Sequence, residues 1–430
     1  AYKDSGIEWI GQVPEHWKVA RVKRLASLRN ERRNDVSTDT IYIGLEDVEA
    51  GSGQYKPTNG SSRQSEDSTV GIFYEGDVLY GKLRPYLRKA IISEMAGCCS
   101  TEFLVLRAEK TEPRWLQEWL LTPDVTHQIE SGCEGAKMPR ADWGHIGSIE
   151  VVYPDQPEQA QILTTLDRET ARIDALVEKK TRFIELLKEK RQALITHAVT
   201  KGLDPNVKMK DSGVEWIGQV PEHWEVKPFK YILSAPMSYG ANESAESDDP
   251  NHPRYIRITD LTENGTLRED TFKTLPWDKA YSYLLSDGDI LLARSGATVG
   301  KSFLYRETNG AACFAGYLIK ASCNEEKALP KYIYAYLQSH SYWEYISGSN
   351  IQSTIQNVSA EKYSSMVLPV PQREEQATIA ATLDRETARI DALIGKAEQS
   401  ITLLKERRSA FITAAVTGQI EDRKSTRLNS

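Results

Sequence analysis

Residues 295–302 come closest in this chain to a nucleotide-binding motif. They read Ser-Gly-Ala-Thr-Val-Gly-Lys-Ser, whereas a phosphate-binding loop requires glycine at the position of Ser295. A helix should follow the lysine and serine of such a loop, but Phe303-Leu304-Tyr305 favours a strand. We therefore expect no nucleotide site here. A glycine-rich turn that offers Arg294 and Lys301 to a phosphate backbone is the better interpretation.

Basic residues gather in two other parts of the chain. Residues 18–34 contain seven lysines and arginines against one glutamate, which gives a local charge of +6. Residues 82–89 contain four more, arranged around Pro85-Tyr86 just after an expected strand. Arginine and lysine beside aromatic and glycine-rich turns suit contacts with DNA phosphates and base edges. A solvated basic face explains the same pattern equally well, so both interpretations stay open at this point.

The residue types that usually carry catalysis or bind metals form no convincing site. The seven histidines contain neither H-x-x-x-H nor H-E-x-x-H spacing, and the five cysteines contain no C-x-x-C pair. No G-x-S-x-G sequence is present. We expect His16 and His223, which stand in the repeated sequence Pro-Glu-His-Trp, to be packing residues. The sequence thus predicts a chain without a catalytic or metal site.

The composition is typical of a folded, soluble protein. The 430 residues have a formal net charge of −7, with 40% hydrophobic and 27% charged residues. No stretch approaches the roughly 18 apolar residues of a membrane span, and the polar start lacks the apolar core of a signal peptide. Together with the odd cysteine count, these features predict a cytoplasmic protein. The acidic total does not exclude a nucleic-acid partner, because a local basic face is what matters.

The chain contains an internal duplication. Residues 3–17 return at 210–224 with one difference, and residues 167–176 return unchanged at 384–393, 217 residues later. The sequences between these blocks diverge, although short matches persist. A chain that keeps its frame and varies its inserts indicates a scaffold that presents two different binding surfaces.

Two long helices are predicted next to the second repeated block. A heptad pattern starts at Leu163 and runs for about five heptads, and it returns from Ala380. Its polar exceptions are Lys180, Arg191 and Arg408. We expect the helices to begin near Pro157 and Pro371 and to end at Gly202 and Gly418, and to bury their seams on each other. Such a coiled coil could be purely structural.

The segments between the helices read as mixed α/β. Short β-branched and aromatic runs predict strands at 41–43, 78–80, 103–106, 290–292 and 317–319. Helices are expected at 113–131 and 330–347.

These blocks together resemble a known family. The chain is similar to the specificity subunit of type I restriction-modification systems in K-D-S-G-[IV]-E-W-I-G-Q-V-P-E-H-W, in the duplicated D-R-E-T-A-R-I-D-A-L, and in the segments 76–89 and 288–301. The last two read G-D-V-L-Y-G-K-L-R-P-Y-L-R-K and G-D-I-L-L-A-R-S-G-A-T-V-G-K. The resemblance covers about residues 2–418, and the blocks occur in order, twice.

The resemblance implies a mixed α+β fold in which two target-recognition domains are joined by two long antiparallel coiled-coil helices with pseudo-two-fold symmetry. Each domain would read one half of an asymmetric bipartite target in double-stranded DNA. The helices would set the gap and dock two methyltransferase subunits, which carry S-adenosylmethionine and methylate adenine. Restriction and motor subunits would use ATP and Mg²⁺. The specificity subunit itself would bind no cofactor and catalyse nothing.

The implied domains follow the repeats. They are 1–153, the first target-recognition domain; 154–203, the first spacer helix; 204–370, a linker and the second target-recognition domain; 371–418, the second spacer helix; and 419–430, a tail expected to be disordered.

The resemblance also implies that two loops in each domain touch DNA. In the first domain the candidates are Lys82, Arg84 and Arg88, with Lys137, Met138 and Arg140 from a later loop. In the second domain they are Arg294, Ser295, Thr298 and Lys301, with Gln352, Ser353 and Gln356 from a later loop. Arginine can pair with guanine and glutamine with adenine, but we assign no bases.

Three other functions compete with this interpretation. The chain could serve a fused nuclease-methyltransferase, which neighbouring genes would reveal. It could be a coiled-coil scaffold that joins two protein-binding domains, in which case salt-dependent DNA binding should be absent. It could use ATP at residues 295–302, in which case replacing Lys301 should abolish nucleotide binding.

Overall fold

The computed structural model describes residues 1–37, 39–58, 68–133, 137–262, 265–350 and 357–419. The chain forms two compact units, one made of residues 1–180 with 399–430 and the other of residues 181–398. Among the described residues, no helix has the length and apolar character needed to cross a membrane. The tail predicted at 419–430 falls, from residue 420 onward, outside the described residues.

The first unit is built on a central antiparallel sheet with the strand order β4-β11-β8-β9. These strands are β4 (Ala26–Leu28), β11 (Phe103–Ala108), β8 (Val78–Gly81) and β9 (Ala90–Ile92). Every residue of β8 is buried, because alternate side chains enter different cores. Tyr80 packs with the helices of the domain, whereas Leu79 packs with a second sheet.

That second sheet has the order β5-β7-β10-β6 and contains one parallel pair, β10 with β6. Its strands are β5 (Arg32–Arg33), β7 (Val70–Phe73), β10 (Gly97–Cys99) and β6 (Tyr42–Ile43). Two antiparallel pairs complete the strands of the unit: β1 (Tyr2–Asp4) with β2 (Gln12–Pro14), and β3 (Lys18–Arg21) with β12 (Glu150–Tyr153). The strands predicted at 41–43, 78–80 and 103–106 are confirmed.

Three short helices cover the first domain: α1 (Pro113–Leu121), α2 (Pro123–Glu130) and α3 (Trp143–Ser148). The single helix predicted at 113–131 is therefore wrong in one respect, since it divides at Thr122. Thr122 has extended backbone angles, as expected for a residue that precedes a proline. Trp119 and Leu120 of α1 lie on the central sheet and close the core.

The central sheet of the second unit has the same strand order as that of the first, whereas its second sheet consists of one parallel pair among the described strands. The central sheet is β16-β21-β18-β19, a parallel pair joins β17 to β20, and antiparallel pairs join β15 to β22 and β13 to β14. The strands are β13 (Met209–Asp211), β14 (Gln219–Pro221), β15 (Glu225–Pro228), β16 (Ser238–Tyr239), β17 (Arg254–Ile256), β18 (Ile290–Ala293), β19 (Ser302–Leu304), β20 (Ala312–Phe314), β21 (Leu318–Ala321) and β22 (Val367–Val370). The strands predicted at 290–292 and 317–319 are confirmed.

The helices of the second domain are α5 (Trp277–Ala280), α6 (Pro330–Tyr336), α7 (His340–Asn350) and α8 (Ala360–Ser365). The single helix predicted at 330–347 is also divided in two. Here the hydroxyl of Ser339 accepts a hydrogen bond from the backbone N–H of Tyr342, so it caps the restarted helix.

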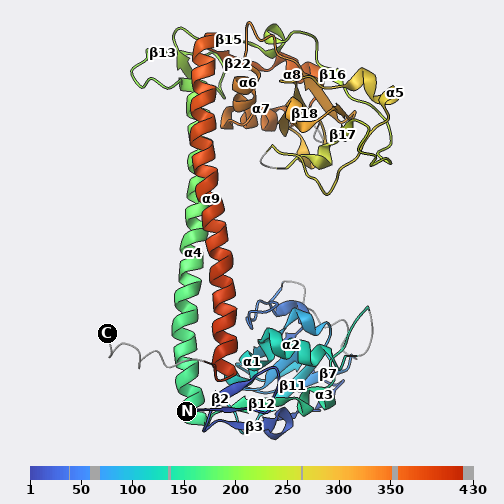
Figure 1. Cartoon of the computed structure of the whole chain (residues 1–430), viewed down its shortest axis with the longest axis vertical. Coiled ribbons are helices and arrows are strands. Elements are labelled where there is room, and N and C mark those ends of the chain that lie inside the picture. The colour runs from blue at the N-terminus through green and yellow to red at the C-terminus, as the bar shows by residue number, and fades with distance from the viewer. Residues whose placement is uncertain (38, 59–67, 134–136, 263–264, 351–356, 420–430) are drawn as a thin grey trace. The chain divides into compact units, whose positions relative to one another are not determined.

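The two long helices, α4 (Gln156–Lys201) and α9 (Arg373–Val416), pack together in antiparallel orientation (Figure 1). The predicted heptad positions are buried or half-buried in both helices, which confirms the seam. Two of its polar exceptions form ion pairs across the seam. Arg191 Nε lies 2.9 Å from Asp391 Oδ1, and Arg408 Nε lies 2.9 Å from Asp174 Oδ1. These pairs are equivalent under the spacing of 217 residues, and each unit contains one.

Candidate nucleic-acid interface

In the first domain, the two loops predicted to contact DNA are joined by backbone hydrogen bonds. Residues 82–84 continue from β8 and pair with residues 139–141 through an antiparallel bridge between Leu83 and Arg140. The N–H of Arg84 donates to the carbonyl of Pro139 at 2.8 Å, and the N–H of Ala141 donates to the carbonyl of Lys82 at 2.8 Å. The structure therefore brings Lys82, Arg84 and Arg140 together.

The predicted DNA-contacting residues of this domain differ in whether their side chains already bond to other groups of the chain. Arg140 makes two hydrogen bonds to the Glu102 carboxylate, at 3.1 and 3.2 Å. Arg88 Nη1 donates to the carbonyl of Leu121 at 3.3 Å, where the cation faces the C-terminus of α1. Lys137 and Met138 are exposed. Arg84 is exposed, and its side chain has no ion pair with any described residue.

Arg84 and Arg88 also share an uncommon backbone conformation. Their φ angles are 53° and 48°, which makes them the non-glycine residues with positive φ in the described part of the chain. Such angles cost free energy for a residue with a side chain, so the surrounding turn must hold them. The turn thus fixes where these two arginines leave the backbone.

The second domain contains the same backbone frame. Ser295 forms an antiparallel bridge with Asn357, and the N–H of Val358 donates to the carbonyl of Arg294 at 2.8 Å. Gln352, Ser353 and Gln356, which directly precede this bridge in the sequence, lie outside the described residues.

Residues 295–302 do not have the structure of a phosphate-binding loop. A short 3₁₀-helix spans Gly296–Thr298, where Thr298 Oγ1 donates to the carbonyl of Ser295 at 3.3 Å, and strand β19 follows. The predicted strand is therefore confirmed. Gly300 has a φ of +86°, and a Cβ atom there would lie 2.8 Å from the ring of Trp343. Close packing explains this glycine. Lys301 is half-buried beside it.

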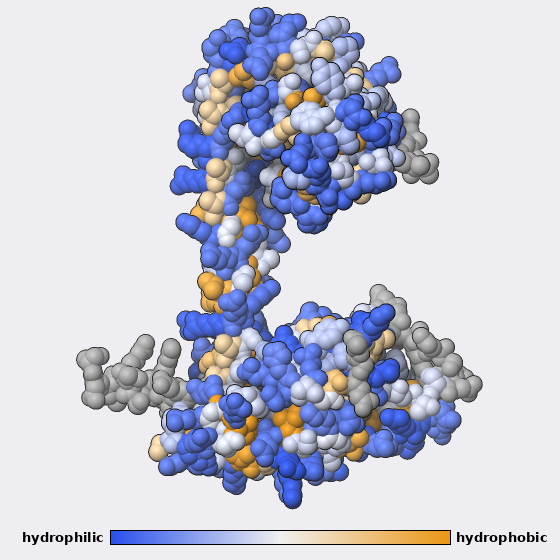
Figure 2. Space-filling view, turned by 45° about the vertical axis from the view of Figure 1, so that its right-hand side comes forward, coloured by the Kyte–Doolittle hydropathy of each residue, from blue (hydrophilic) through white to orange (hydrophobic). Residues whose placement is uncertain are grey.

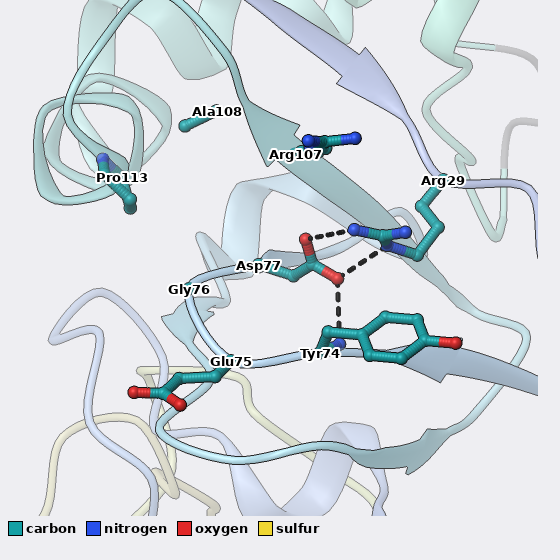
Figure 3. Close-up of a pocket in the computed structure, with 8 residues that line it drawn as sticks. All are labelled: Arg29, Tyr74, Glu75, Gly76, Asp77, Arg107, Ala108 and Pro113. Carbon is teal, nitrogen blue, oxygen red and sulfur yellow. Dashed lines mark hydrogen bonds and ion pairs between the residues drawn. The ribbon is translucent and has the colours of Figure 1, made fainter.

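A pocket lies at the opposite end of strand β8 from Lys82 (Figure 3). Its volume is about 480 Å³, and its lining includes Arg29, Tyr74, Glu75, Asp77 and Arg107. Arg29 makes two hydrogen bonds to Asp77, at 2.8 and 3.2 Å, and stacks on the Tyr74 ring at 4.6 Å. The hydrogen bonds that Arg29 donates to the Asp77 carboxylate raise the pKa of its guanidinium. Because two carboxylates balance two cations, the lining is not selective for an anion.

Buried carboxylates that recur in both halves have a structural role. Asp77 accepts hydrogen bonds from Tyr74 N at 2.9 Å and from Arg29, whereas its counterpart Asp289 accepts from Ser286 N at 2.8 Å. Both lie in the turns that begin the central strands of the sheets. Each carboxylate holds its turn closed. Among the described residues, no group of three or more His, Cys, Asp or Glu side chains is placed to hold a metal ion.

The expectation that His16 and His223 are packing residues is wrong. Both are exposed, and their Nε2 atoms lie 2.8 Å from Glu158 and Glu375, respectively, which belong to the first turns of the long helices. The tryptophans that follow each histidine are the packed residues, at 2% and 0% exposure. The polar histidine therefore stays at the rim while its neighbour enters the core.

Gln159 and Gln376 each join a long helix to the start of a shorter helix of its domain, a structural role that sequence reasoning missed. Both are fully buried. The side-chain carbonyl of Gln159 accepts from Glu112 N at 2.9 Å, and that of Gln376 accepts from Leu329 N at 2.8 Å. Glu112 and Leu329 are the N-cap residues of α1 and α6. The signal in the sequence was the dipeptide Glu-Gln, which occurs at 158–159 and again at 375–376. Its recurrence in both halves indicates a shared structural role, which is to attach each long helix to its domain.

Comparison with known proteins agrees with this architecture. The type I restriction modification DNA specificity domain matches residues 221–403. The chain is 22% identical over 190 residues to the EcoDI specificity subunit of Escherichia coli, which covers 44% of this chain and 43% of that subunit. It is 23% identical over 310 residues to the MjaVIII specificity subunit of Methanocaldococcus jannaschii, which covers 68% of this chain and 67% of that one. The match to EcoDI thus spans less than half of that relative.

Solved structures share the fold. One is a chain from a structure that describes complex assembly and conformational transition of a type I R-M system. It superposes with a TM-score of 0.75 at 17% identity, covering 95% of this chain and 99% of that chain. The HsdS subunit from Thermoanaerobacter tengcongensis gives a TM-score of 0.56 at 18% identity, covering 95% of this chain and 98% of that one. The duplicated domains and paired long helices are the fold that this chain shares with these solved structures. Residues 221–403 are therefore similar to a type I restriction modification DNA specificity domain, and the chain is similar to specificity subunits of such systems.

Proposed function

We propose that the chain reads an asymmetric bipartite sequence in double-stranded DNA, with one half-site for each domain. The carrying observation is the repeated frame in which a loop after the central strand is bridged to a later loop, at Leu83–Arg140 and at Ser295–Asn357. A scaffold with two copies of one frame supplies two reading surfaces of the same geometry. The half-sites differ because the side chains on the two frames differ.

Equivalent backbone positions identify those differences. Lys82 N donates to the carbonyl of Glu102 at 2.9 Å, and Arg294 N donates to the carbonyl of Tyr317 at 3.1 Å. The three matched positions of the frame therefore carry Lys82, Glu102 and Arg140 in the first domain and Arg294, Tyr317 and Asn357 in the second. The proposed contact surface adds the other predicted residues: Arg84, Arg88, Lys137, Met138, Ser295, Thr298, Lys301, Gln352, Ser353 and Gln356.

The long helices are proposed to dock two methyltransferase subunits. Duplicated exposed leucines support this: Leu176 and Leu393 are each 40% exposed, and Leu186 and Leu403 are 47% and 57% exposed, in pairs separated by 217 residues. Figure 2 shows apolar residues among hydrophilic ones along the helices. Exposed apolar residues that recur at equivalent positions suit two copies of one partner.

In this proposal, catalysis belongs to the partners. The methyltransferase subunits would supply S-adenosylmethionine and methylate adenine, and restriction and motor subunits would use ATP and Mg²⁺. The chain described here would bind no cofactor and would act through DNA and subunit binding alone. A fused nuclease-methyltransferase as the single partner is the alternative arrangement.

A genome-wide adenine-methylation map tests the proposal. Cells would express the chain with its neighbouring methyltransferase, and control cells would lack the chain. A new split motif is expected, and exchanging residues 18–153 for those of a relative should change one half of it. Exchanging residues 225–370 is the matched experiment and should change the other half. If the two proteins associate but no motif appears, the protein-scaffold function replaces this one.

A further inference from the structure

Arg294 leaves the end of strand β18 at the frame position that Lys82 occupies in the first domain. We propose that Arg294, held by Tyr239, reads a guanine in the second half-site. The inference rests on the proposed function and makes it specific, because it assigns one base to one side chain and names the residue that positions it.

The backbone of Arg294 is fixed on both sides. Its N–H donates to Tyr317, its carbonyl accepts from Val358, and the next residue is bridged to Asn357. The preceding carbonyl, of Ala293, accepts a hydrogen bond from the buried Tyr363 hydroxyl at 2.8 Å. A side chain that starts from so constrained a backbone keeps its base in one place, as selective contacts require.

The guanidinium is held as well. Its Cζ atom lies 4.8 Å from the centre of the Tyr239 ring, within the range of a cation–π contact. Tyr239 is in turn fixed by its hydroxyl, which accepts from Ala360 N at 3.1 Å, and by the pairing of β16 with β21. Tyr239 is 42% exposed, so the stacked pair lies at the surface. Tyr239 thus acts as a positioning residue.

Arg294 also keeps its hydrogen-bonding capacity. Arg140 and Arg29 are matched by carboxylates, whereas Arg294 forms no ion pair with any described residue. Its Nε is buried and has no hydrogen-bond partner in the part of the chain that the structure describes. The side chain is thus committed to no described acceptor of the chain, and the hydrogen bonds of its guanidinium fork remain to be made by a ligand.

A guanine explains this arrangement better than a phosphate does. Phosphate contacts need only a nearby cation, which the flexible Lys82 supplies at the equivalent position. A stacked guanidinium has a fixed plane and presents a fork of parallel N–H groups. That geometry matches the O6 and N7 acceptors of guanine in the major groove.

The methylation map again supplies the test, with Arg294→Lys, Tyr239→Leu and Tyr239→Phe in the full chain with its methyltransferase. Arg294→Lys should relax one guanine position of the second half-site, reducing discrimination there by about tenfold to a hundredfold. Tyr239→Leu should relax the same position, whereas Tyr239→Phe should leave it unchanged, because the ring and the β16–β21 pairing that places it are kept. Tyr231→Leu is the matched control, since it removes an exposed tyrosine beside Lys230, 5.3 Å away, elsewhere in the domain.

Loss of methylation that is uniform over all sequences would show a phosphate contact and overturn the guanine inference. An unchanged motif in Arg294→Lys would overturn it too. If the parent chain yields no split motif, the proposed function and this inference both fail. If Arg294→Lys does not fold, the two Tyr239 variants decide. Relaxed selection of the guanine in Tyr239→Leu, without relaxation in Tyr239→Phe, supports the inference. Equal behaviour of the two variants contradicts it.

Discussion

Some arginines of this protein form an ion pair with a carboxylate of the chain, and others do not. Arg29 has Asp77, and Arg140 has Glu102. Arg84 and Arg294 have no such partner among the described residues, and both stand beside the bridge of their domain. An unmatched cation at a fixed turn is available to a polyanion, whereas an ion-paired one must first give up its carboxylate. The unmatched arginines are therefore the first residues to replace.

We expect Arg84→Ala to weaken DNA binding by the assembled complex to a similar extent on all sequences. The lost contact would be with a phosphate, so the slope of log K against log salt should fall by about 1. Arg107→Ala is the matched control, because that arginine is exposed at the other end of the sheet. Loss of a preference for a single base would contradict the phosphate assignment.

The thiols of Cys99, Cys313 and Cys323 predict a loss of stability in alkali. Burial raises the pKa of Cys99, Cys313 and Cys323 to about 12. In the unfolded chain these thiols lose their protons near pH 8.5, so above that pH the folded state holds more protons than the unfolded state. The free energy of unfolding should thus fall from about pH 8.5 up to pH 12. Urea titrations at several pH values measure this, and Cys313→Ala should reduce the slope.

At the scale of elements, the sequence predicts helices that have a regular heptad pattern and end at a glycine. It does not predict which segments pair when they lie far apart in the chain. The helix seam follows from its heptads, and the helix ends follow from Gly202 and Gly418, whose φ angles are +76° and +75°. The breaks at Thr122 and Ser339 depend on one proline and one capping hydroxyl inside helical patterns. The two loops of each domain were predicted to contact DNA from the family resemblance alone.

The bridge that joins those loops carries no local signal. It links residues far apart in the sequence, Leu83 with Arg140 and Ser295 with Asn357. Nothing in either segment specifies the other, because the pairing depends on where the sheets place both ends. The ring contact between Arg294 and Tyr239 is beyond sequence reasoning for the same reason, since it needs β16 and β18 to lie on either side of β21.

The seam arginines allow a test of the helix pair. Arg191→Leu should raise the free energy of unfolding by about 1 kcal/mol, because a leucine at a seam position buries apolar surface. The ion pair that it removes is half-exposed and contributes little. Thermal unfolding measures the change, and Arg408→Leu should give the same shift. Arg182→Leu, at an exposed position, should give none. A lowered midpoint for Arg191→Leu would show that the ion pair is the stronger contribution.

On the scale of the whole molecule, the two long helices end in equivalent contacts. The turn at Gly202 packs on Trp224 and Pro221, and the turn at Gly418 packs on Trp17 and Pro14. Gln419 Nε2 adds a hydrogen bond to the carbonyl of Ile10 at 2.8 Å. Each repeated Pro-Glu-His-Trp motif therefore receives the end of a long helix.

Gly418→Ala should destabilise the protein by about 1–3 kcal/mol. The positive φ disfavours any side chain, and the added Cβ would lie 2.9 Å from Pro14 and 3.0 Å from Trp17. Chemical denaturation measures the loss. Gly395→Ala, in the interior of α9 with open space around it, is the matched control and should stabilise slightly. An equal effect of both substitutions would rule out the packing explanation.

These two junctions use the same proline and tryptophan of the repeated motif but differ in covalent topology. One joins segments that follow each other closely in the chain, from Gly202 to Trp224, and the other joins Gly418 to Trp17 across almost the whole sequence. The second junction forms without a short covalent tether, so we expect the equivalent contacts of the first to form without one as well. Opening the backbone within residues 203–208 would therefore leave two fragments that together retain both junctions, and the order of the repeats along the chain is separable from their order in space.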